Sequence, residues 1–446
     1  MEQLLHYCWK HKLFPLKQLT TTDGQTVDVI DTGLHNADAG PDFLNAKVKI
    51  DDTVWVGNVE IHVKSSDWYA HRHEHDAAYN NVILHVADVI DTEVRTQDGR
   101  TVSQLHLSVP QKVSRQYERL LAIDAYPPCY EIIPHLSRLT VHSWMSALQS
   151  ERLAQKTDRI NERLRSCNGD WEATLFVTLA RNYGFGINGD AFEQWALAIP
   201  LQHVAHHRDD LFQIEAFFMG QAGLLGLETA PQQHREAMAA DDYFVCLCNE
   251  YQFLSRKFSL QPIDAKQWKF LRLRPQNFPY IRLAQLASLY HRQRFGLRNI
   301  VECETLDELR DMLRIGVTPY WETHYVFGAV SASTDKRLSE QTIDVLIINT
   351  VIPTLFAYGR YLLSERLCER ALLWLEQLKA ENNHIVKMWK ACGLEAQNAG
   401  DSQALIQLKT AYCDRKECLR CRMGYEYLKG TAQPKQANEN ASTEHK

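Results

Sequence analysis

Histidines and carboxylates gather in one stretch of the sequence, between Asn36 and Val86. It contains Asp42, Glu60, His62, His71, His73, His75 and His85. Carboxylate oxygens bind hard divalent ions such as Mg²⁺, whereas imidazole nitrogens bind softer ions such as Zn²⁺ or transfer protons near neutral pH. These residue types therefore predict metal-assisted or acid–base chemistry in this part of the chain.

An alternating segment, residues 53–64, is expected to position three of these polar side chains. Apolar residues take its odd positions from 59 to 63, and Glu60, His62 and Lys64 take the even ones. Side chains of one parity point to the same face of a strand. The spacing thus predicts a strand with a buried apolar face and a polar face that carries the trio.

A second strand is expected at residues 43–50, where the apolar residues take the even positions and Phe43 falls with the polar ones. The Asp-Asp pair at 51–52 is typical of a short turn between two paired strands. A hairpin would place Asp42, just ahead of the first strand, close to Glu60 on the second. Two carboxylates held in this way would bind a divalent ion that also meets a phosphate.

The combination of Pro41-Asp42 with Glu60-x-His62 resembles the PD-(D/E)XK nuclease superfamily, over roughly residues 1–110. The resemblance implies a restriction-endonuclease-like α/β domain in which Asp42 and Glu60 hold Mg²⁺ or Mn²⁺. It also implies that the residue at the Lys position orients or activates water. Here that position holds His62, with Lys64 on the same face, so either residue takes the role or the site is inactive.

Three functions are compatible with this stretch. The favoured one is metal-dependent hydrolysis of phosphodiester bonds in nucleic acid. A second is a non-catalytic scaffold that binds nucleic acid or protein on a degenerate nuclease core. A third is a zinc hydrolase that uses His71, His73, His75 and His85. The preceding Ser65-Ser66-Asp67 predicts a loop around these histidines, and histidines in loops are commonly only solvated.

The domain organisation is predicted from the distribution of proline and of helical periodicity. Three prolines in residues 126–134 predict a stiff connector after an α/β domain at 1–125. Apolar residues at helical spacing predict a large all-α domain at 135–430. The small, polar residues 431–446 predict a disordered tail.

A basic and aromatic segment, residues 256–298, lies within the predicted helical domain. Cations that meet phosphates and aromatic rings that stack on bases are what single-stranded nucleic acid requires. The predicted nucleic-acid-binding residues are Lys269, Arg272, Arg274 and Arg282. The alternative is that the aromatic residues belong to the core and that the arginines are solvated or form internal ion pairs.

Three cysteines near the end of the sequence, Cys413, Cys418 and Cys421, have a spacing typical of metal ligands. They predict a structural Zn²⁺ or iron–sulfur site, with Cys392 or Cys129 as the fourth ligand. No Glu or His near them is placed as a general base, so a catalytic role is not expected.

Composition bounds the remaining expectations. With 11 cysteines and no recognisable signal peptide or long apolar run, the chain is expected to be cytoplasmic and not to enter a membrane. A net charge of −6 predicts that any nucleic-acid binding comes from a local patch. The oligomeric state is not predicted. The whole chain also resembles an uncharacterised bacterial family with the segments AGPDF, GNVEIH, SSDW, RLRPQNFP and CLRC.

Overall fold

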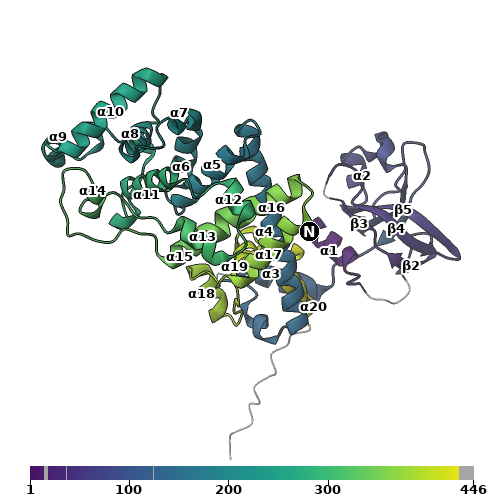
Figure 1. Ribbon diagram of the computed structural model, residues 1–446. Helices are drawn as coiled ribbons and strands as arrows, with labels where there is room; N and C mark the ends of the chain where they lie inside the picture. Colours follow the sequence, from purple (N-terminus) through teal and green to yellow (C-terminus); the bar gives the residue numbers. More distant parts are fainter. Residues whose placement is uncertain (15–18, 37, 124, 431–446) are drawn as a thin grey trace, which may run out of the picture. The chain divides into compact units, whose positions relative to one another are not determined.

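The chain forms two compact units in a computed structural model that describes residues 1–14, 19–36, 38–123 and 125–430 (Figure 1). The first unit comprises Met1–Trp144, Met388–Leu394 and Gln407–Lys446, and the second comprises Met145–Lys387 and Glu395–Ile406. The predicted connector at 126–134 thus lies inside the first unit, and so does the cysteine-rich end of the predicted helical domain. The predicted disordered tail lies outside the described residues.

The first unit is built on a mixed sheet. Its strands are β1 (Leu19–Thr20), β2 (Thr26–Asp31), β3 (Leu34–His35), β4 (Phe43–Ile50), β5 (Thr53–Lys64), β6 (Val82–Val89) and β7 (Ser103–His106). The strand order is β1-β2-β4-β5-β6-β7, and β3 pairs with β4. The pairs up to β5 are antiparallel, whereas β6 runs parallel to β5 and to β7. Thr21 also bridges to Leu105 of β7, so the two ends of the strand path meet.

The predicted hairpin is formed by β4 and β5, but its register departs from simple alternation. Phe43 pairs with Val59 and Ala46 pairs with Gly57, so β4 carries one extra residue. Asn45 absorbs it with a φ of +56°, a conformation that asparagine tolerates better than most residues. The bulge turns Phe43 to the buried face, which corrects its expected place among the polar residues.

One face of the sheet packs on helix α1 (Glu2–Lys10). Leu5 and Trp9 of this helix join side chains from β2, β4, β5, β6 and β7 in a single apolar cluster. The opposite face carries the even residues of β5. It is covered by the segment that links β5 to β6, which contains α2 (Asp67–Ala70) and the 3₁₀ turns η1 (His73–His75) and η2 (Ala77–Tyr79). Both faces of β5 are therefore buried near Glu60.

The remaining elements of the first unit are helical. They are α3 (Gln111–Ala122), η3 (Tyr130–His135), η9 (Leu408–Cys413), η10 (Cys418–Arg420) and α20 (Arg422–Lys429). Helix α20 packs on α3, η3 and η10. Helices α4 (Arg138–Ser166) and α18 (His384–Ala391) each have residues in both units.

The regular elements of the second unit are helices among the described residues, with one isolated bridge between His324 and Val330. Its α-helices are α5 (Trp171–Tyr183), α6 (Gly189–Leu197), α7 (Leu201–Ala205), α8 (Leu211–Gln221), α9 (Arg235–Ala239), α10 (Asp242–Phe258), α11 (Pro279–Arg292), α12 (Leu297–Glu302), α13 (Leu306–Leu313), α14 (Pro319–Glu322), α15 (Glu340–Leu346), α16 (Ile352–Tyr361), α17 (Glu365–Gln377) and α19 (Ala399–Gln407). Shorter turns are η4 (Leu227–Thr229), η5 (Gln232–His234), η6 (Ala265–Gln267), η7 (Pro275–Asn277) and the π-helical η8 (Ile347–Val351). The prediction of an α/β part followed by a helical part is confirmed at this level.

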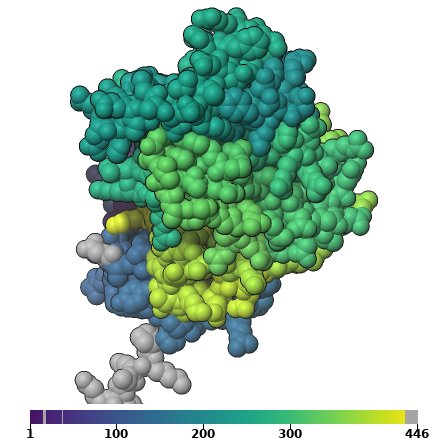
Figure 2. Space-filling model, turned by 60° about the vertical axis from the view of Figure 1, so that its left-hand side comes forward, coloured from purple at the N-terminus to yellow at the C-terminus, as the bar shows by residue number. Residues whose placement is uncertain are grey.

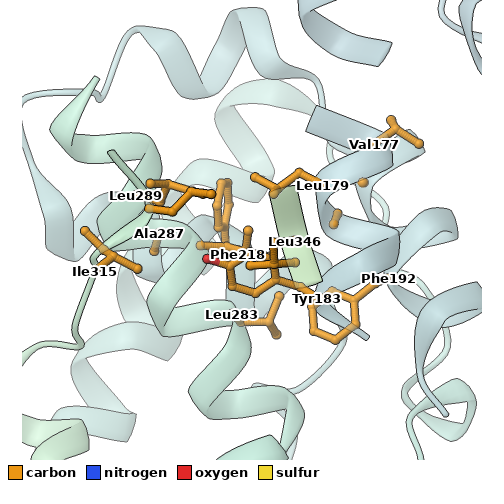
Figure 3. Close-up of a cluster of buried hydrophobic side chains, with 14 of the residues drawn as sticks. Val177, Leu179, Tyr183, Phe192, Phe218, Leu283, Ala287, Leu289, Ile315 and Leu346 are labelled. Atoms are coloured by element: carbon orange, nitrogen blue, oxygen red, sulfur yellow. The ribbon is translucent and has the colours of Figure 1, made fainter. Parts of the chain in front are cut away.

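A large apolar core holds the second unit together. Figure 3 shows Tyr183, Phe218, Leu283 and Leu346, from four different helices, gathered in it. The space-filling view shows the segments of this unit, coloured teal and green, in close packing (Figure 2). The core supplies the burial that amphipathic helices need in order to be stable.

One segment of this core, Glu340–Tyr361, is long and apolar enough to cross a membrane by length and composition alone. The sequence-based expectation of no such run is therefore corrected. In the structure 67% of its most apolar window is buried inside the protein, which is typical of a core helix.

Candidate functional site

Glu60 is the first of a row of polar residues that crosses three neighbouring strands. It pairs with His85 of β6, and His85 pairs with Gln104 of β7. Residues paired in this way project to the same face of a sheet. All three are buried, as is His62 two positions along β5. The predicted polar face of β5 exists, but it is covered by protein and not by solvent.

Asp42 and Glu60 are brought together by the hairpin, as the sequence predicts. The backbone N–H of Asp42 donates to Glu60 Oε2 at 3.0 Å, and the backbone N–H of Ile61 donates to Asp42 Oδ2 at 2.9 Å. His6 of α1 completes the contact, with its Nε2 3.3 Å from Asp42 Oδ2. One oxygen of each carboxylate is thus held by the backbone, which fixes both side chains in place.

The other oxygen of Glu60 faces two histidines. Glu60 Oε1 lies 3.3 Å from His73 Nε2 and 3.6 Å from His62 Nε2. His62 Nε2 also lies 3.2 Å from Nδ1 of His71. Ligand atoms of His62, His71 and His73 lie within 4.8 Å of one another, and among the described residues only this set of three or more potential metal ligands does so.

The histidines of the H-x-H-x-H motif are separated by their local backbone. Arg72 has a φ of +61°, and this reversal places His71 and His73 on the same side of the chain. His75 is three-quarters exposed and forms an ion pair with Glu74. The zinc set expected from His71, His73, His75 and His85 is therefore corrected, because His62 and not His75 joins His71 and His73.

Aromatic side chains of the segment that links β5 to β6 line one side of the site. The ring of Tyr79 stacks on His73 with 3.9 Å between their centroids. Trp68 contacts His73, Tyr79 and His85 edge to face. Such packing restricts the rotamer of His73 and keeps water from one side of the cluster, so the geometry of the potential ligands is fixed in advance.

The tautomers of the buried histidines follow from the hydrogen-bond network. The amide of Gln104 is oriented by donation from Nε2 to Thr92 O at 3.1 Å, and the same group lies 3.5 Å from His85 Nδ1. His85 then carries its proton on Nε2 and donates to His62 Nδ1 at 2.9 Å. This leaves the proton of neutral His62 on Nε2, facing Glu60 and His71.

Burial sets the ionisation of this network. It lowers the pKa of His62 to about 3 and that of His85 to about 4, and neighbouring imidazoles add to both effects. Both rings are therefore neutral at pH 7. A neutral imidazole offers one lone pair and one N–H, so each ring can accept or donate but carries no charge.

The two carboxylates respond to their surroundings in opposite ways. Burial raises the pKa of Glu60, the charge of Asp42 adds to this effect, and the hydrogen bond from His73 offsets it only in part. Burial also opposes ionisation of Asp42, but the hydrogen bond and charge of His6 outweigh it and hold the pKa of Asp42 below its ordinary value. Asp42 is thus the more readily ionised of the two carboxyl groups, and Glu60 gains most from a cation.

Lys64 lies outside this cluster. It is exposed at the end of β5, and its backbone N–H donates to Asp67 Oδ2 at 3.0 Å. Of the two residues predicted to orient water, only His62 therefore faces the carboxylates.

The basic and aromatic segment takes a different form from the predicted stacking surface. Trp268 and Tyr280 are buried in the helical core, and Phe270, Tyr290 and Phe295 pack against it. The aromatic faces are thus used in packing. This arrangement agrees with the alternative in which these residues belong to the core.

The same packing buries one of the predicted phosphate-binding residues and leaves the other three exposed. Arg282 is buried, and its guanidinium donates to Gln285 Oε1 at 2.8 Å and to Asn277 Oδ1 at 2.6 Å. Its predicted role in nucleic-acid binding is corrected, because a buried side chain with internal partners does not meet a phosphate. Lys269, Arg272 and Arg274 are exposed.

The C-terminal cysteines lie in the first unit and close to Cys129. Burial raises the pKa of Cys129 well above its usual range, and the thiols of Cys421, Cys413 and Cys418 add to this shift. The pKa of Cys392, in contrast, is raised by burial alone. Of the two predicted fourth ligands, the structure brings Cys129 to the trio.

Three residues of the site are absent from the sequence-based set: His6, Tyr79 and Gln104. His6 lies in a helix whose pattern shows only a buried face, and Tyr79 and Gln104 reach the cluster through crossover connections. Of these three, only Gln104 could have been found from the sequence, because it is a polar residue in an alternating strand. Pairing between distant strands cannot be read from such local patterns.

The chain belongs to the family described as protein of unknown function (DUF2851), whose model matches residues 2–384. Comparisons with curated proteins and with solved structures found no match.

Proposed function

We propose that this member of the family is a metal-dependent hydrolase of phosphodiester bonds, with its site at Glu60, His62, His71 and His73. The observation that carries the proposal is the position of Glu60 Oε1, which lies 3.3 Å from His73 Nε2 and 3.6 Å from His62 Nε2. An ion placed there would relieve the cost of ionising buried Glu60 and would find fixed nitrogen ligands.

The donor set suggests which ion fits. Glu60, His71 and His73 offer one oxygen and two nitrogens, a mixture that suits Mn²⁺ or Zn²⁺ better than Mg²⁺, which prefers oxygen ligands alone. Such an ion supplies Lewis acidity and neutralises the charge of a phosphate. Asp42 supports the site from behind, because its backbone N–H fixes the second oxygen of Glu60.

His62 is assigned the role of the Lys in the superfamily that the motif resembles. Its Nε2–H faces the same space as Glu60 Oε1 and His71 Nδ1, so it orients a water or phosphate oxygen by donating a hydrogen bond. His85 and Gln104 hold it in the required tautomer. His62 is thus an orienting donor in this proposal, and His73 is a ligand.

The substrate class rests on two further observations. The order of a strand hairpin followed by a helix and a parallel strand agrees with the resemblance of Pro41-Asp42 and Glu60-x-His62 to the nuclease superfamily. A loop in the second unit carries exposed Lys266, Lys269, Arg272 and Arg274, without an ion pair among the described residues. Exposed cations on such a loop are suited to phosphates of a nucleic acid.

The test combines cleavage and metal-binding assays on the full chain. After removal of metal, single- and double-stranded DNA and RNA are incubated with Mg²⁺, Mn²⁺ or Zn²⁺. We expect cleavage to be greatest with Mn²⁺ or Zn²⁺. Calorimetry then compares His73→Ala with His75→Ala, a matched control from the same motif whose side chain lies outside the cluster. Only His73→Ala should lose metal affinity, by about 10- to 100-fold.

Variants of His62 separate metal binding from the orientation of water. His62→Ala should keep most of the metal affinity and lose cleavage, and His62→Lys should recover part of the rate. Absence of cleavage with every metal and substrate, or equal metal binding by the His73→Ala and His75→Ala variants, would contradict the proposal.

A second candidate function is non-catalytic binding of nucleic acid or protein by the same fold. It is favoured by the exposed position of Lys64, because the buried cluster then lacks the ammonium group of the superfamily. In this case the wild-type protein and His62→Lys should both bind a nucleic acid without cleaving it.

A further inference from the structure

Four cysteines of the first unit occupy the ends of four neighbouring elements. Cys129 precedes η3, Cys413 ends η9, Cys418 begins η10 and Cys421 precedes α20. Helix α20 packs on both η3 and η10, and η10 packs on η9. The fold therefore gathers the four elements that carry these cysteines.

The four thiols are largely withdrawn from solvent and none forms a disulfide. Cys129 and Cys421 are 8% and 7% exposed. Burial raises the pKa of Cys413 and of Cys421, and each of these thiols is shifted further by the other cysteines of the group. Mutual electrostatic effects of this kind occur between groups that are close in space.

Hydrogen-bond donors surround the sulfurs. The backbone N–H groups of Met423 and Gly424 donate to the sulfur of Cys421. The Tyr126 hydroxyl, beside Cys413 and Asp414, and the Trp144 indole N–H, beside Cys421, are both buried. Donors aimed at sulfur stabilise a thiolate, which is the form that binds a metal.

Gly424 shows how closely this segment is packed. A Cβ at this position would lie 2.1 Å from the carbonyl oxygen of Cys418. The close approach of the backbone at 424 to the backbone at 418 shapes the Cys-x-x-Cys segment, and it places the N–H of Gly424 toward Cys421.

We propose that Cys129, Cys413, Cys418 and Cys421 together ligate one metal centre and that Cys392 is not a ligand. This site is separate from the histidine cluster and does not depend on the proposed hydrolase function. Four protein thiolates leave no open position, so the centre is structural.

Four cysteine thiolates can hold either a single zinc ion or an iron–sulfur cluster. The sulfurs around one zinc at 2.3 Å would stand about 3.8 Å apart, whereas the cysteines of a cluster stand farther apart. The contents of iron, sulfide and zinc therefore distinguish the two kinds of centre.

The centre would join two segments that are distant in sequence. Cys129 follows the sheet and α3, whereas the other three ligands come from the last described elements. Helix α20 already touches the N-terminal part of the first unit, where the ring of Tyr425 lies 4.6 Å from that of His11, just after α1. Metal ligation would fix this contact and contribute to the stability of the first unit.

The experiment uses the full chain, purified without oxygen, with His73→Ala as background so that metal at the histidine cluster does not contribute. Iron, acid-labile sulfide and zinc are measured per chain, together with visible absorption. We expect about four iron atoms with sulfide, or about one zinc ion. Cys129→Ser and Cys421→Ser should lose this metal, and Cys392→Ser, the matched control, should retain it.

A second measurement tests the proposal without cysteine substitutions, in case those variants do not fold. The metal is removed from the background protein by a chelator, and ferrous iron with sulfide, or Zn²⁺ alone, is added back. Removal should lower the melting temperature by several degrees and addition should restore it. The proposal is overturned if the freshly purified protein holds neither iron nor zinc, or if Cys392→Ser loses metal as Cys129→Ser does.

Discussion

The sheet unit and the helical unit each bury ionisable side chains, but they surround them differently. In the sheet unit Glu60 is faced by the Nε2–H of His62 and by His73, whose nitrogen can share a cation with it. In the helical unit Glu215 is equally buried, yet its oxygens are met by the hydroxyls of Tyr243 and Thr318. Hydroxyls stabilise a buried carboxyl but are poor metal ligands, so only the first site is equipped for metal chemistry.

Arg282 extends this comparison to cations. It lies over the ring of Phe185 at 4.5 Å and donates to two amide oxygens, so its charge is used within the core. The exposed side chains of Arg272 and Arg274 form no ion pair among the described residues. Burial with internal hydrogen-bond partners indicates a structural role, whereas burial beside unused lone pairs indicates a site.

The largest effect is expected from Glu60→Gln. The substitution keeps the shape of the side chain but removes the negative charge that would hold a divalent ion. Metal-dependent cleavage should fall about 1000-fold, equivalent to about 4 kcal/mol of transition-state stabilisation. Glu215→Gln is the matched control, and its activity per folded molecule should stay within about twofold. Equal losses in both variants would remove the distinction between the two buried carboxyls.

Arg282→Met should lower the free energy of unfolding by about 3 to 4 kcal/mol. It leaves the amide oxygens of Gln285 and Asn277 without their donor in a buried place. Arg274→Met, at an exposed position of the same segment, should change it by less than about 0.5 kcal/mol. Urea denaturation followed by tryptophan fluorescence measures both. A stable Arg282→Met variant that binds nucleic acid more weakly would show that Arg282 belongs to the binding surface after all.

Glu215 should make stability depend on pH. Burial raises its pKa to about 7 from the ordinary 4.5, so the folded state keeps its proton longer than the unfolded state as the pH rises. The contribution is therefore full below pH 4.5 and is lost by about 3 kcal/mol as the pH rises to 7. Denaturation at several pH values should show this fall, and Glu215→Gln should abolish it. The exposed Glu228→Gln should leave it unchanged.

The smallest effect is expected from the exposed cations. Arg272→Gln with Arg274→Gln should weaken binding of a single-stranded oligonucleotide several-fold. It should also reduce the slope of log affinity against log salt by about 1.4, or about 0.7 for each phosphate that is no longer neutralised. Arg298→Gln is the control, because Arg298 is paired with Glu302. An unchanged slope in the double variant would leave the helical unit without a nucleic-acid surface at this loop.

The features that the sequence predicts correctly are local ones. Alternation in residues 53–64 and the Asp-Asp turn are enough to predict the hairpin, and the hairpin alone brings Asp42 to Glu60. The bulge at Asn45 is not visible in the alternation, because one residue with a positive φ shifts the parity of all those before it. This explains why Phe43 is buried against expectation.

The features that the sequence does not predict depend on contacts between distant segments. His71 and His73 reach His62 only because β6 pairs parallel to β5 and the linking segment folds back over the sheet. Arg282 shows the converse, since Arg272 and Arg274 in the same basic segment are exposed while the helix of Arg282 is buried in the core. Side-chain type and spacing do not reveal which face of a helix a larger core will cover.

The bridge between Thr21 and Leu105 has a consequence for the behaviour of the protein at high concentration. Unpaired strand edges recruit edges from other molecules, and this is a common beginning of fibril formation. In the described part of the sheet the terminal strands β1 and β7 are short and partly joined by this bridge, so little edge is open to another chain. Opening of that junction would expose β7 and the apolar strand β6 beside it, which makes the junction the point where self-association is expected to start.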